Sequence, residues 1–262
     1  MEQQVARLVE KAWDKFQKTP EEKRLLKSLL PGSSVMFSSL TSTSFYPRIS
    51  GIPGSGKTTL SQIVTTRLNA RAATLDPSNP TRTSHPPAAF VPMDGYHLTR
   101  AQLSAMPDPK TAHARRGAAF TFDGPAFHKL VTSLREPLRA DSSPIYAPSF
   151  DHAVKDPKEN DIAIQPYHRI VVFEGNYLTL DKPPWSDAAK LMDELWFVDV
   201  DFEVARKRLI GRHVKAGIAK NEEEADKRAR ENDLVNGKEI VDFRLTVDEV
   251  VTSREDDEWI HE

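Results

Sequence analysis

The sequence predicts an α/β fold, in which a parallel β-sheet is covered by helices on both faces. Short apolar runs recur along the chain and alternate with segments of helical spacing. Strands of a parallel sheet are buried on both faces, so they read as continuous apolar runs of this kind. The second observation is a glycine-rich stretch at residues 51–58, placed where a strand would pass into a helix.

That stretch fits G-x-x-x-x-G-K-[ST], the phosphate-binding loop (P-loop) of nucleoside triphosphate enzymes. Glycines let backbone N–H groups point at phosphate oxygens, and the helix expected over 59–69 adds its dipole. Lys57 would contact the β- and γ-phosphates, and the Thr58 hydroxyl is placed to ligate Mg²⁺. The sequence therefore predicts the P-loop nucleoside triphosphate hydrolase fold, with nucleotide-binding residues Gly51, Ile52, Pro53, Gly54, Ser55, Gly56, Lys57, Thr58 and Thr59.

The N-terminal residues predict a helical extension at 1–32, ahead of a kinase-sized domain at 33–262. Apolar residues recur at helical spacing over 2–18, which indicates an amphipathic helix that packs against the rest of the protein. Thr19, Pro20 and Glu22 form a capping box with proline at the first helical position, so a second helix is expected to about residue 30.

Residues 33–50 fit the fold least well, because a phosphate loop should follow a buried strand directly. Residues 35–40 would make a good strand but end ten residues before Gly51. Residues 45–50 are in the right place, but Pro47 lacks a backbone donor for a central strand. Two readings stay open: a short, distorted first strand, or an inserted Ser/Thr-rich segment at 33–50.

The remaining elements follow from local patterns. Strands are expected at 89–93, 169–173 and 195–200, an edge strand at 162–166, and helices at 125–138 and 202–213. Residues 71–88 are rich in Pro, Ser and Thr and read as a surface loop, and 144–152 reads as a proline-punctuated loop.

Acidic residues stand at the ends of three of these strands: Asp94, Glu174 and Asp199. Ligands of open parallel sheets bind beyond the carboxyl ends of the strands, so these positions are candidates for function. We expect Asp94 to accept the proton of a substrate hydroxyl and Glu174 to join the Mg²⁺ shell, directly or through water. The alternative is that they cap the following turns, which we favour for Asp199.

The basic run at 206–215 places Arg208 and Arg212 on one helix face. Such a run is usually a solvated surface. After a strand of a P-loop protein, it better suits a lid that closes arginines over the phosphoryl oxygens. His97, His113 and His152 lack the spacing of a compact metal site, and are instead candidates for hydrogen bonds to substrate.

The composition limits the partners. The 262 residues carry a net charge of -2, with no basic excess that would favour nucleic acid. No apolar run approaches the roughly 20 residues of a membrane span. The absence of cysteine excludes disulfides and zinc–thiolate sites. The N-terminus lacks the apolar core of a secretory signal, so a cytoplasmic protein is expected, as a monomer or a homodimer.

Several ordered motifs between about residues 51 and 251 resemble the uridine kinase/phosphoribulokinase/pantothenate kinase group. The likeness is greatest to its fungal and bacterial uridine-kinase-like members, including fructose-transport-kinase-like proteins. It rests on GIPGSGKTT at 51–59, PMDGYHL at 92–98, RRGAAFTFD at 115–123, YAPSFDH at 146–152, VFEGNYL at 172–178 and RLIGRHV at 208–214. The group runs a strand straight into the loop, so residues 33–50 depart from its pattern.

The resemblance implies a kinase that uses ATP with Mg²⁺ and transfers a phosphoryl group to a hydroxyl of a small metabolite. It matches Asp94 to the general base and places Asn232, Asp233, Asn236 and Gly237 near the adenine. It also matches five residues to the acceptor pocket: Tyr96, His97, Arg116, Asp151 and His152.

We therefore expect an ATP-dependent small-molecule kinase, in which Lys57, Arg208 and Arg212 act on the phosphates and Asp94 on the acceptor. The acceptor is a nucleoside, a sugar or a pantothenate-like acid. Two alternatives stay open, a P-loop NTPase without a small acceptor and a nucleotide-binding regulator that has lost its chemistry. Neither of them needs a base at position 94.

Overall fold

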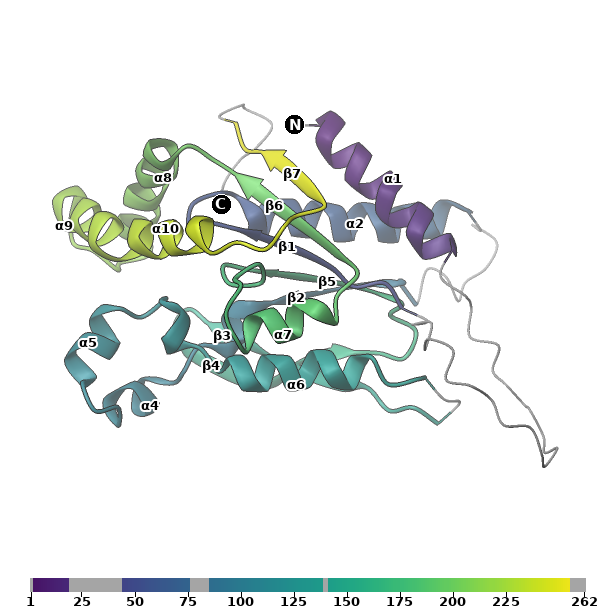
Figure 1. The fold of residues 1–262 in the computed structure, drawn as a ribbon, viewed down its shortest axis with the longest axis horizontal. Helices are drawn as coiled ribbons and strands as arrows, with labels where there is room; N and C mark the ends of the chain where they lie inside the picture. The colour runs from purple at the N-terminus through teal and green to yellow at the C-terminus, as the bar shows by residue number, and fades with distance from the viewer. Residues whose placement is uncertain (1, 19–43, 76–84, 139–140, 255–262) are drawn as a thin grey trace.

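The computed structural model describes residues 2–18, 44–75, 85–138 and 141–254, and its centre is a five-stranded parallel sheet (Figure 1). The strand order is β2-β5-β1-β6-β7, and each neighbouring pair is parallel. This confirms the α/β prediction. The strands are β1 (Pro47–Gly51), β2 (Ala88–Pro92), β5 (Ile170–Gly175), β6 (Glu194–Asp199) and β7 (Glu249–Thr252).

Helices cover both faces of the sheet, because successive side chains of each strand alternate between two hydrophobic cores. Ile170 and Val172 pack with α1 (Glu2–Lys18) and α2 (Lys57–Leu75). Val171 and Phe173 pack on the opposite face with α6 (Gly124–Leu134) and α7 (Trp185–Lys190). Figure 1 shows these two helix layers above and below the sheet.

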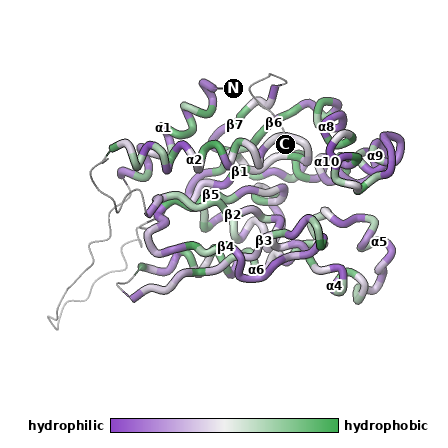
Figure 2. Tube along the Cα trace, turned by 180° about the vertical axis from the view of Figure 1, so that it is seen from behind, coloured by the Kyte–Doolittle hydropathy of each residue, from purple (hydrophilic) through white to green (hydrophobic). Residues whose placement is uncertain are grey.

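A group of helices follows β6 and lies beyond the carboxyl ends of the strands (Figure 1). It comprises α8 (Phe202–Lys215), α9 (Glu222–Arg228), the π-helical turn η3 (Ala229–Asp233) and α10 (Leu234–Asp242). Figure 2 shows α9 as largely hydrophilic, which fits its exposed position. No helix in the described ranges combines the length and apolar character needed to cross a membrane.

The strand before the loop is β1, at the centre of the sheet between β5 and β6. Pro47 is its first residue, where a missing donor costs least. Phe45 and Tyr46, just before it, are buried. Residues 47–50 of the candidate insertion thus belong to the sheet, whereas 33–43 and the second helix expected at 19–30 lie outside the described residues.

Two predicted loops are corrected by the structure. Helix α2 continues to Leu75, so only part of 71–88 leaves the helix, and residues 76–84 lie outside the described ranges. The segment at 144–152 forms β3 (Ile145–Asp151), which pairs with β4 (Asp156–Ile164) in an antiparallel hairpin. The register shifts between Ala147 and Ser149, so Pro148 sits at an irregularity that tolerates its missing N–H.

Short helices that we did not predict connect β2 to α6. They are η1 (Met93–Tyr96), α4 (Arg100–Ser104), α5 (Pro109–Ala114) and η2 (Ala119–Thr121). Thr99 begins α4 with a complete capping box, and the Asp108 side chain caps α5. These elements and the β3–β4 hairpin form one wall at the carboxyl edge of the sheet (Figure 1).

Candidate active site

The loop between β1 and α2 has the backbone of an anion cradle. Gly54 and Gly56 have φ values of 81° and 85°, a region that glycine enters readily. A Cβ atom at Gly54 would lie 2.7 Å from the Ala205 carbonyl oxygen, so α8 packs directly on the loop. The Ser55 Oγ is buried inside the loop, without a hydrogen-bond partner in the described chain, and it lies close to Gly51, where a Cβ would be 2.6 Å from it.

Lys57 and Thr58 open α2, and both meet Glu174 at the end of β5. The Lys57 Nζ lies 3.9 Å from the Glu174 Oε1, and both side chains are largely buried. Burial raises the pKa of Glu174 to about 7, although the Lys57 ammonium opposes the shift. The nearby Thr58 hydroxyl also favours the ionised form of the Glu174 carboxyl group and so acts to lower its pKa. Burial likewise lowers the pKa of Lys57, against the effect of the Glu174 carboxylate.

These residues fit a magnesium ion. Mg²⁺ prefers oxygen ligands and commonly takes one or two from the protein, with the rest from phosphates and water. The Thr58 hydroxyl and Glu174 carboxylate supply such oxygens side by side. A cation there would also favour the ionised form of Glu174. The described residues hold no cluster of three or more His, Asp or Glu side chains, so a closed protein-only metal cage is not formed among them.

Asp94 lies in η1, directly after β2, and reaches the same edge of the sheet. Strand β2 pairs with β5 so that Pro92 is opposite Glu174. Its carboxylate acts on the pKa of both Lys57 and Glu174, after the larger effects of burial and of the Lys57–Glu174 pair. The side chain is 51% exposed, so it is open to a substrate. Asp94, Lys57 and Glu174 are therefore brought together.

The His97 ring is fixed beside Asp94. Its Nδ1 lies 2.9 Å from the Asp94 carbonyl oxygen, and the ring packs 4.0 Å from that of Phe122 between centroids. Burial lowers the pKa of His97, so the ring favours the neutral form. A neutral imidazole here can form a hydrogen bond with a substrate without adding a positive charge beside Asp94.

The other predicted acceptor residues build the wall itself. The Arg116 guanidinium donates to the carbonyl oxygens of Lys155 and Leu98 and to Asp156, which sequence analysis missed. Asp151 Oδ1 accepts from the Ala153 and Val154 backbone N–H groups and so caps the hairpin turn. His152 is exposed at this turn. Arg116 and Asp151 thus hold the hairpin in place.

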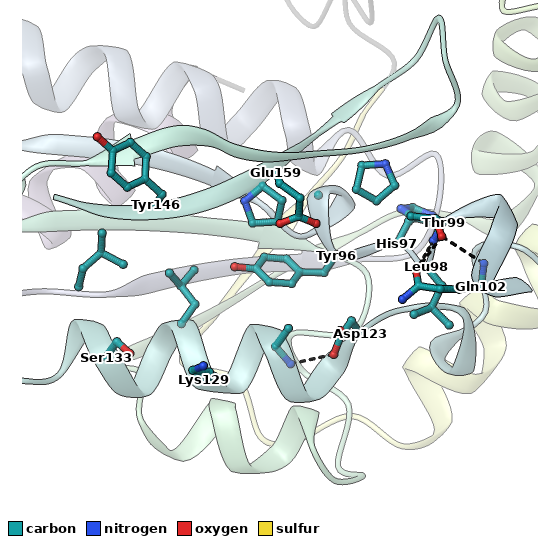
Figure 3. A pocket seen from close by; sticks show the side chains of 16 residues that line it. Tyr96, His97, Leu98, Thr99, Gln102, Asp123, Lys129, Ser133, Tyr146 and Glu159 are labelled. Atoms are coloured by element: carbon teal, nitrogen blue, oxygen red, sulfur yellow. Dashed lines mark hydrogen bonds between the residues drawn. The ribbon is translucent and has the colours of Figure 1, made fainter.

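Tyr96 faces a cavity of about 360 Å³ between η1, α6 and the hairpin (Figure 3). Its ring packs edge-on against Phe127, and 5% of the residue is exposed. Its hydroxyl makes no hydrogen bond within the described chain, and Figure 3 shows it directed away from His97 and Thr99. The cavity is lined by both polar and apolar side chains, among them His97, Asp123, Lys129, Ser133, Tyr146 and Glu159.

No model of a known protein family matches the chain. It is 57% identical over 159 residues to the ATP-dependent kinase-like protein notR' of Aspergillus versicolor, across 61% of this chain and 92% of that protein. It is 41% identical over 188 residues to a Schizosaccharomyces pombe protein whose name proposes a uridine kinase, across 72% of this chain and 74% of the relative. The chain belongs to this family of P-loop kinases.

Solved structures agree with that assignment. A proposed fructose transport system kinase from Silicibacter sp. TM1040 is 29% identical, with a TM-score of 0.69 over 94% of this chain and 98% of that one. YFH7 of Saccharomyces cerevisiae, described as a proposed P-loop kinase with a circular permutation, has a TM-score of 0.77 over 96% and 99% of the two chains. At 23% identity it supports the fold alone.

The two arginines of helix α8 that were predicted to close over the phosphates occupy different surroundings. Arg208 donates to the Gly54 carbonyl oxygen at 3.3 Å and to the Ser253 hydroxyl at 2.9 Å, so it braces the back of the loop. Arg212 is exposed, and its charge contributes to lowering the pKa of both Lys57 and Glu174. Of the two, Arg212 is the one whose charge acts on Lys57 and Glu174.

The segment matched to the adenine side contacts the acceptor wall, helix α8 and the phosphate loop. Asn232 and Asn236 both accept hydrogen bonds from Arg115, at 3.0 and 2.7 Å. Asp233 lies 2.9 Å from the buried His213 Nε2. Gly237 packs closely against Ile52 of the loop: a Cβ atom at this position would lie only 3.2 Å from the Ile52 side chain. Sequence analysis missed the contribution of Arg115.

Proposed function

We propose that the chain transfers the γ-phosphoryl group of ATP to a hydroxyl of a small metabolite. The observation that carries this proposal is the convergence of Lys57, Glu174 and Asp94 at one edge of the sheet, beside the loop. A base next to a phosphate loop is needed only if an acceptor must lose a proton. The names of the relatives, ATP-dependent and uridine kinases among them, support the same reaction class.

Each residue has a defined part in this reaction. The loop amides and Lys57 hold the β- and γ-phosphates, and Thr58 and Glu174 would hold the Mg²⁺. The ion supplies neutralisation of the charge that develops on the phosphate oxygens. Asp94 accepts the proton of the acceptor hydroxyl while its oxygen bonds to the γ-phosphorus. The bond from that phosphorus to the bridging oxygen breaks, and ADP leaves with the electron pair.

The acceptor pocket is the cavity beside η1. It opens next to His97, continues past Tyr96 and offers the unpaired Tyr96 hydroxyl to a ligand. The Tyr96 hydroxyl opens into this cavity, so it can exchange a hydrogen bond with a ligand bound there. The mixed lining suits a compact polar metabolite, which includes a nucleoside, a sugar or a pantothenate-like acid.

The test is phosphoryl transfer from labelled ATP with a panel of these metabolites, in the wild-type chain and in Asp94→Asn. The substitution keeps the size of the side chain but removes its basicity, so transfer should fall by about 10²–10⁴-fold. That factor corresponds to roughly 3–5 kcal/mol in the barrier. ATP affinity should stay within a few-fold, because it depends on the loop and Lys57.

The outcomes separate the three candidate functions. Transfer at a near wild-type rate in Asp94→Asn would show that the assigned base is wrong. Hydrolysis of ATP that no acceptor changes would favour the NTPase. Nucleotide binding without any turnover would favour the regulator.

A further inference from the structure

Arg115 connects the acceptor wall to the helices that follow β6. It ends α5 on the acceptor wall, and its guanidinium reaches two buried asparagines on the lid side. Nε donates to the Asn232 Oδ1 at 3.0 Å, and Nη2 donates to the Asn236 Oδ1 at 2.7 Å. The Asn232 amide returns a hydrogen bond to the Arg116 carbonyl oxygen at 3.0 Å.

The contact continues into both sides of the site. On the lid side, Asn232 and Asp233 share the π-helical turn η3, and Asp233 pairs with His213, the neighbour of Arg212 on α8. On the acceptor side, Arg116 donates to Leu98 and to Asp156 of the hairpin. A hydrogen-bonded chain therefore runs from the helix that carries Arg212 to the wall that carries the acceptor residues.

Asn232 and Asn236 do more than fill space in the protein interior. They are 4% and 1% exposed, and a buried amide costs free energy unless its polar atoms are paired. The planar fork of one guanidinium reaches both amide oxygens at once, and the Asn236 amide adds a longer bond of 3.5 Å to the Asn232 Oδ1. A π-helical turn is rare in proteins and is often found at functional sites. Opening the lid away from the wall would break these bonds together.

We propose that Arg115 is a positioning residue that makes lid closure and ordering of the acceptor wall a single event. Nucleotide that draws α8 toward the phosphates also fixes η3, and through Asn232 and Asn236 it fixes residues 115–117. The acceptor then binds to a wall whose residues 115–117 are already in place. This inference rests on the proposed function, because it requires nucleotide to bind at the loop.

Hydrogen–deuterium exchange of the full chain tests the link without knowledge of the acceptor. Exchange is compared with and without Mg²⁺ and a non-hydrolysable ATP analogue, in wild type, Arg115→Lys and Lys110→Ala. Arg115→Lys keeps the charge but loses the fork. Lys110→Ala removes an exposed cation from the same helix α5 and is the matched control.

In the wild type and the control, the analogue should slow exchange in both 229–236 and 115–121. In Arg115→Lys the lid segment should keep its protection, while the ligand-dependent protection of 115–121 should fall by about tenfold. Coupling free energies between linked sites typically correspond to factors of about 5–150. The melting temperature should fall by no more than about 2–4 °C relative to the control, because a lysine still donates to one of the two buried asparagines and only one hydrogen bond is lost.

Three results would overturn the inference. The first is protection of 115–121 in Arg115→Lys that equals wild type. The second is an equal loss in both segments with a lower melting temperature, which would make Arg115 a structural contact only. The third is an analogue that binds wild type without protecting the lid. If the analogue does not bind wild type at all, the proposed function fails, and this inference falls with it.

Discussion

At the scale of single residues, Arg208 and Arg212 show how one turn of a helix separates two roles. The sequence predicts both as lid arginines, because they lie on one face of α8. The side chain of Arg208 bonds to the Gly54 carbonyl and Ser253, whereas Arg212 is exposed and its charge acts on the pKa of Lys57 and Glu174. Charge that acts on the transition state should therefore come from Arg212.

Arg212→Ala should lower kcat by about 10²-fold or more and leave ATP affinity within a few-fold, because it removes charge that is needed mainly in the transition state. Arg208→Ala should instead weaken ATP binding by about 3–10-fold, the value of one or two hydrogen bonds that brace the loop. Steady-state kinetics separate the two effects, with the exposed Lys207→Ala as control on the same helix. Equal effects of both substitutions on kcat would contradict this division.

The raised pKa of Glu174 should make the affinity for Mg²⁺-nucleotide depend on pH. With a pKa raised to about 7 by burial, its carboxyl group holds a proton below that pH in the nucleotide-free protein. A metal ion must displace this proton, so the affinity for Mg²⁺-nucleotide should fall as the pH drops below about 7, by at most about tenfold per unit. Above that pH the affinity should be flat.

Glu174→Gln should bind Mg²⁺-nucleotide weakly and should lack this part of the dependence, since it has no proton to lose. Titration of the nucleotide itself is common to both proteins and cancels in the comparison. The measurement is the dissociation constant of the Mg²⁺-bound analogue across about two pH units on either side of 7. Parallel curves for the two proteins would remove Glu174 from the metal site.

The sequence could predict which residues meet at the loop, but not every contact around them. Asp94 and Glu174 each follow an apolar strand, and the carboxyl ends of parallel strands share one edge, so their meeting follows from topology. Arg115 and Asn232 are 117 positions apart and sit outside any repeating pattern. Nothing local in the sequence marks such a pair.

At the scale of elements, the apolar runs were predicted as strands, whereas the strand reading of β1 was only one of two alternatives and β3 was read as a loop. Strands β5 and β6 are continuous apolar segments, and both were predicted within a few residues. Strand β1 contains a buried serine, whose hydroxyl is satisfied by the Asn176 carbonyl at 2.9 Å and by Thr179 at 3.0 Å. Strand β3 accommodates Pro148 at its irregularity. In both strands tertiary partners outweigh local propensity.

The N-terminal helix α1 is an element whose importance can be measured. Leu8 is fully buried in the core that α1 shares with α2 and the sheet, so Leu8→Ala should lower the free energy of unfolding by about 2–5 kcal/mol. Gln17→Ala, at an exposed position of the same helix, should change it by less than about 0.5 kcal/mol. Urea denaturation compares the two. Equal midpoints would mean that α1 is not part of the cooperative core in solution.

At the scale of the whole molecule, the two ends of the described chain meet. The Gln4 side chain exchanges two hydrogen bonds with the Thr252 backbone of β7, both at 3.0 Å. Lys11 binds Glu249 of β7 and the buried Glu194 of β6. Helix α1 thus lies against the edge strand and satisfies backbone groups that a free edge would expose. A contact across 248 positions has no local signature in the sequence.

The loop, the sheet and both helix layers form one structure, so nucleotide bound at the loop should stabilise all of it. A ligand at about 100 times its dissociation constant adds about 2.7 kcal/mol to the native state. For a chain of this size the melting temperature should rise by about 5–10 °C. Lys57→Ala should abolish most of the rise, because it removes the charge that holds the phosphates. Asp94→Asn should keep it, because Asp94 acts on the acceptor.

A scanning thermal unfolding experiment with Mg²⁺ and a non-hydrolysable ATP analogue measures all three proteins. A rise that survives in Lys57→Ala, or is lost in Asp94→Asn, would mean that these two residues do not divide nucleotide binding and acceptor chemistry between them.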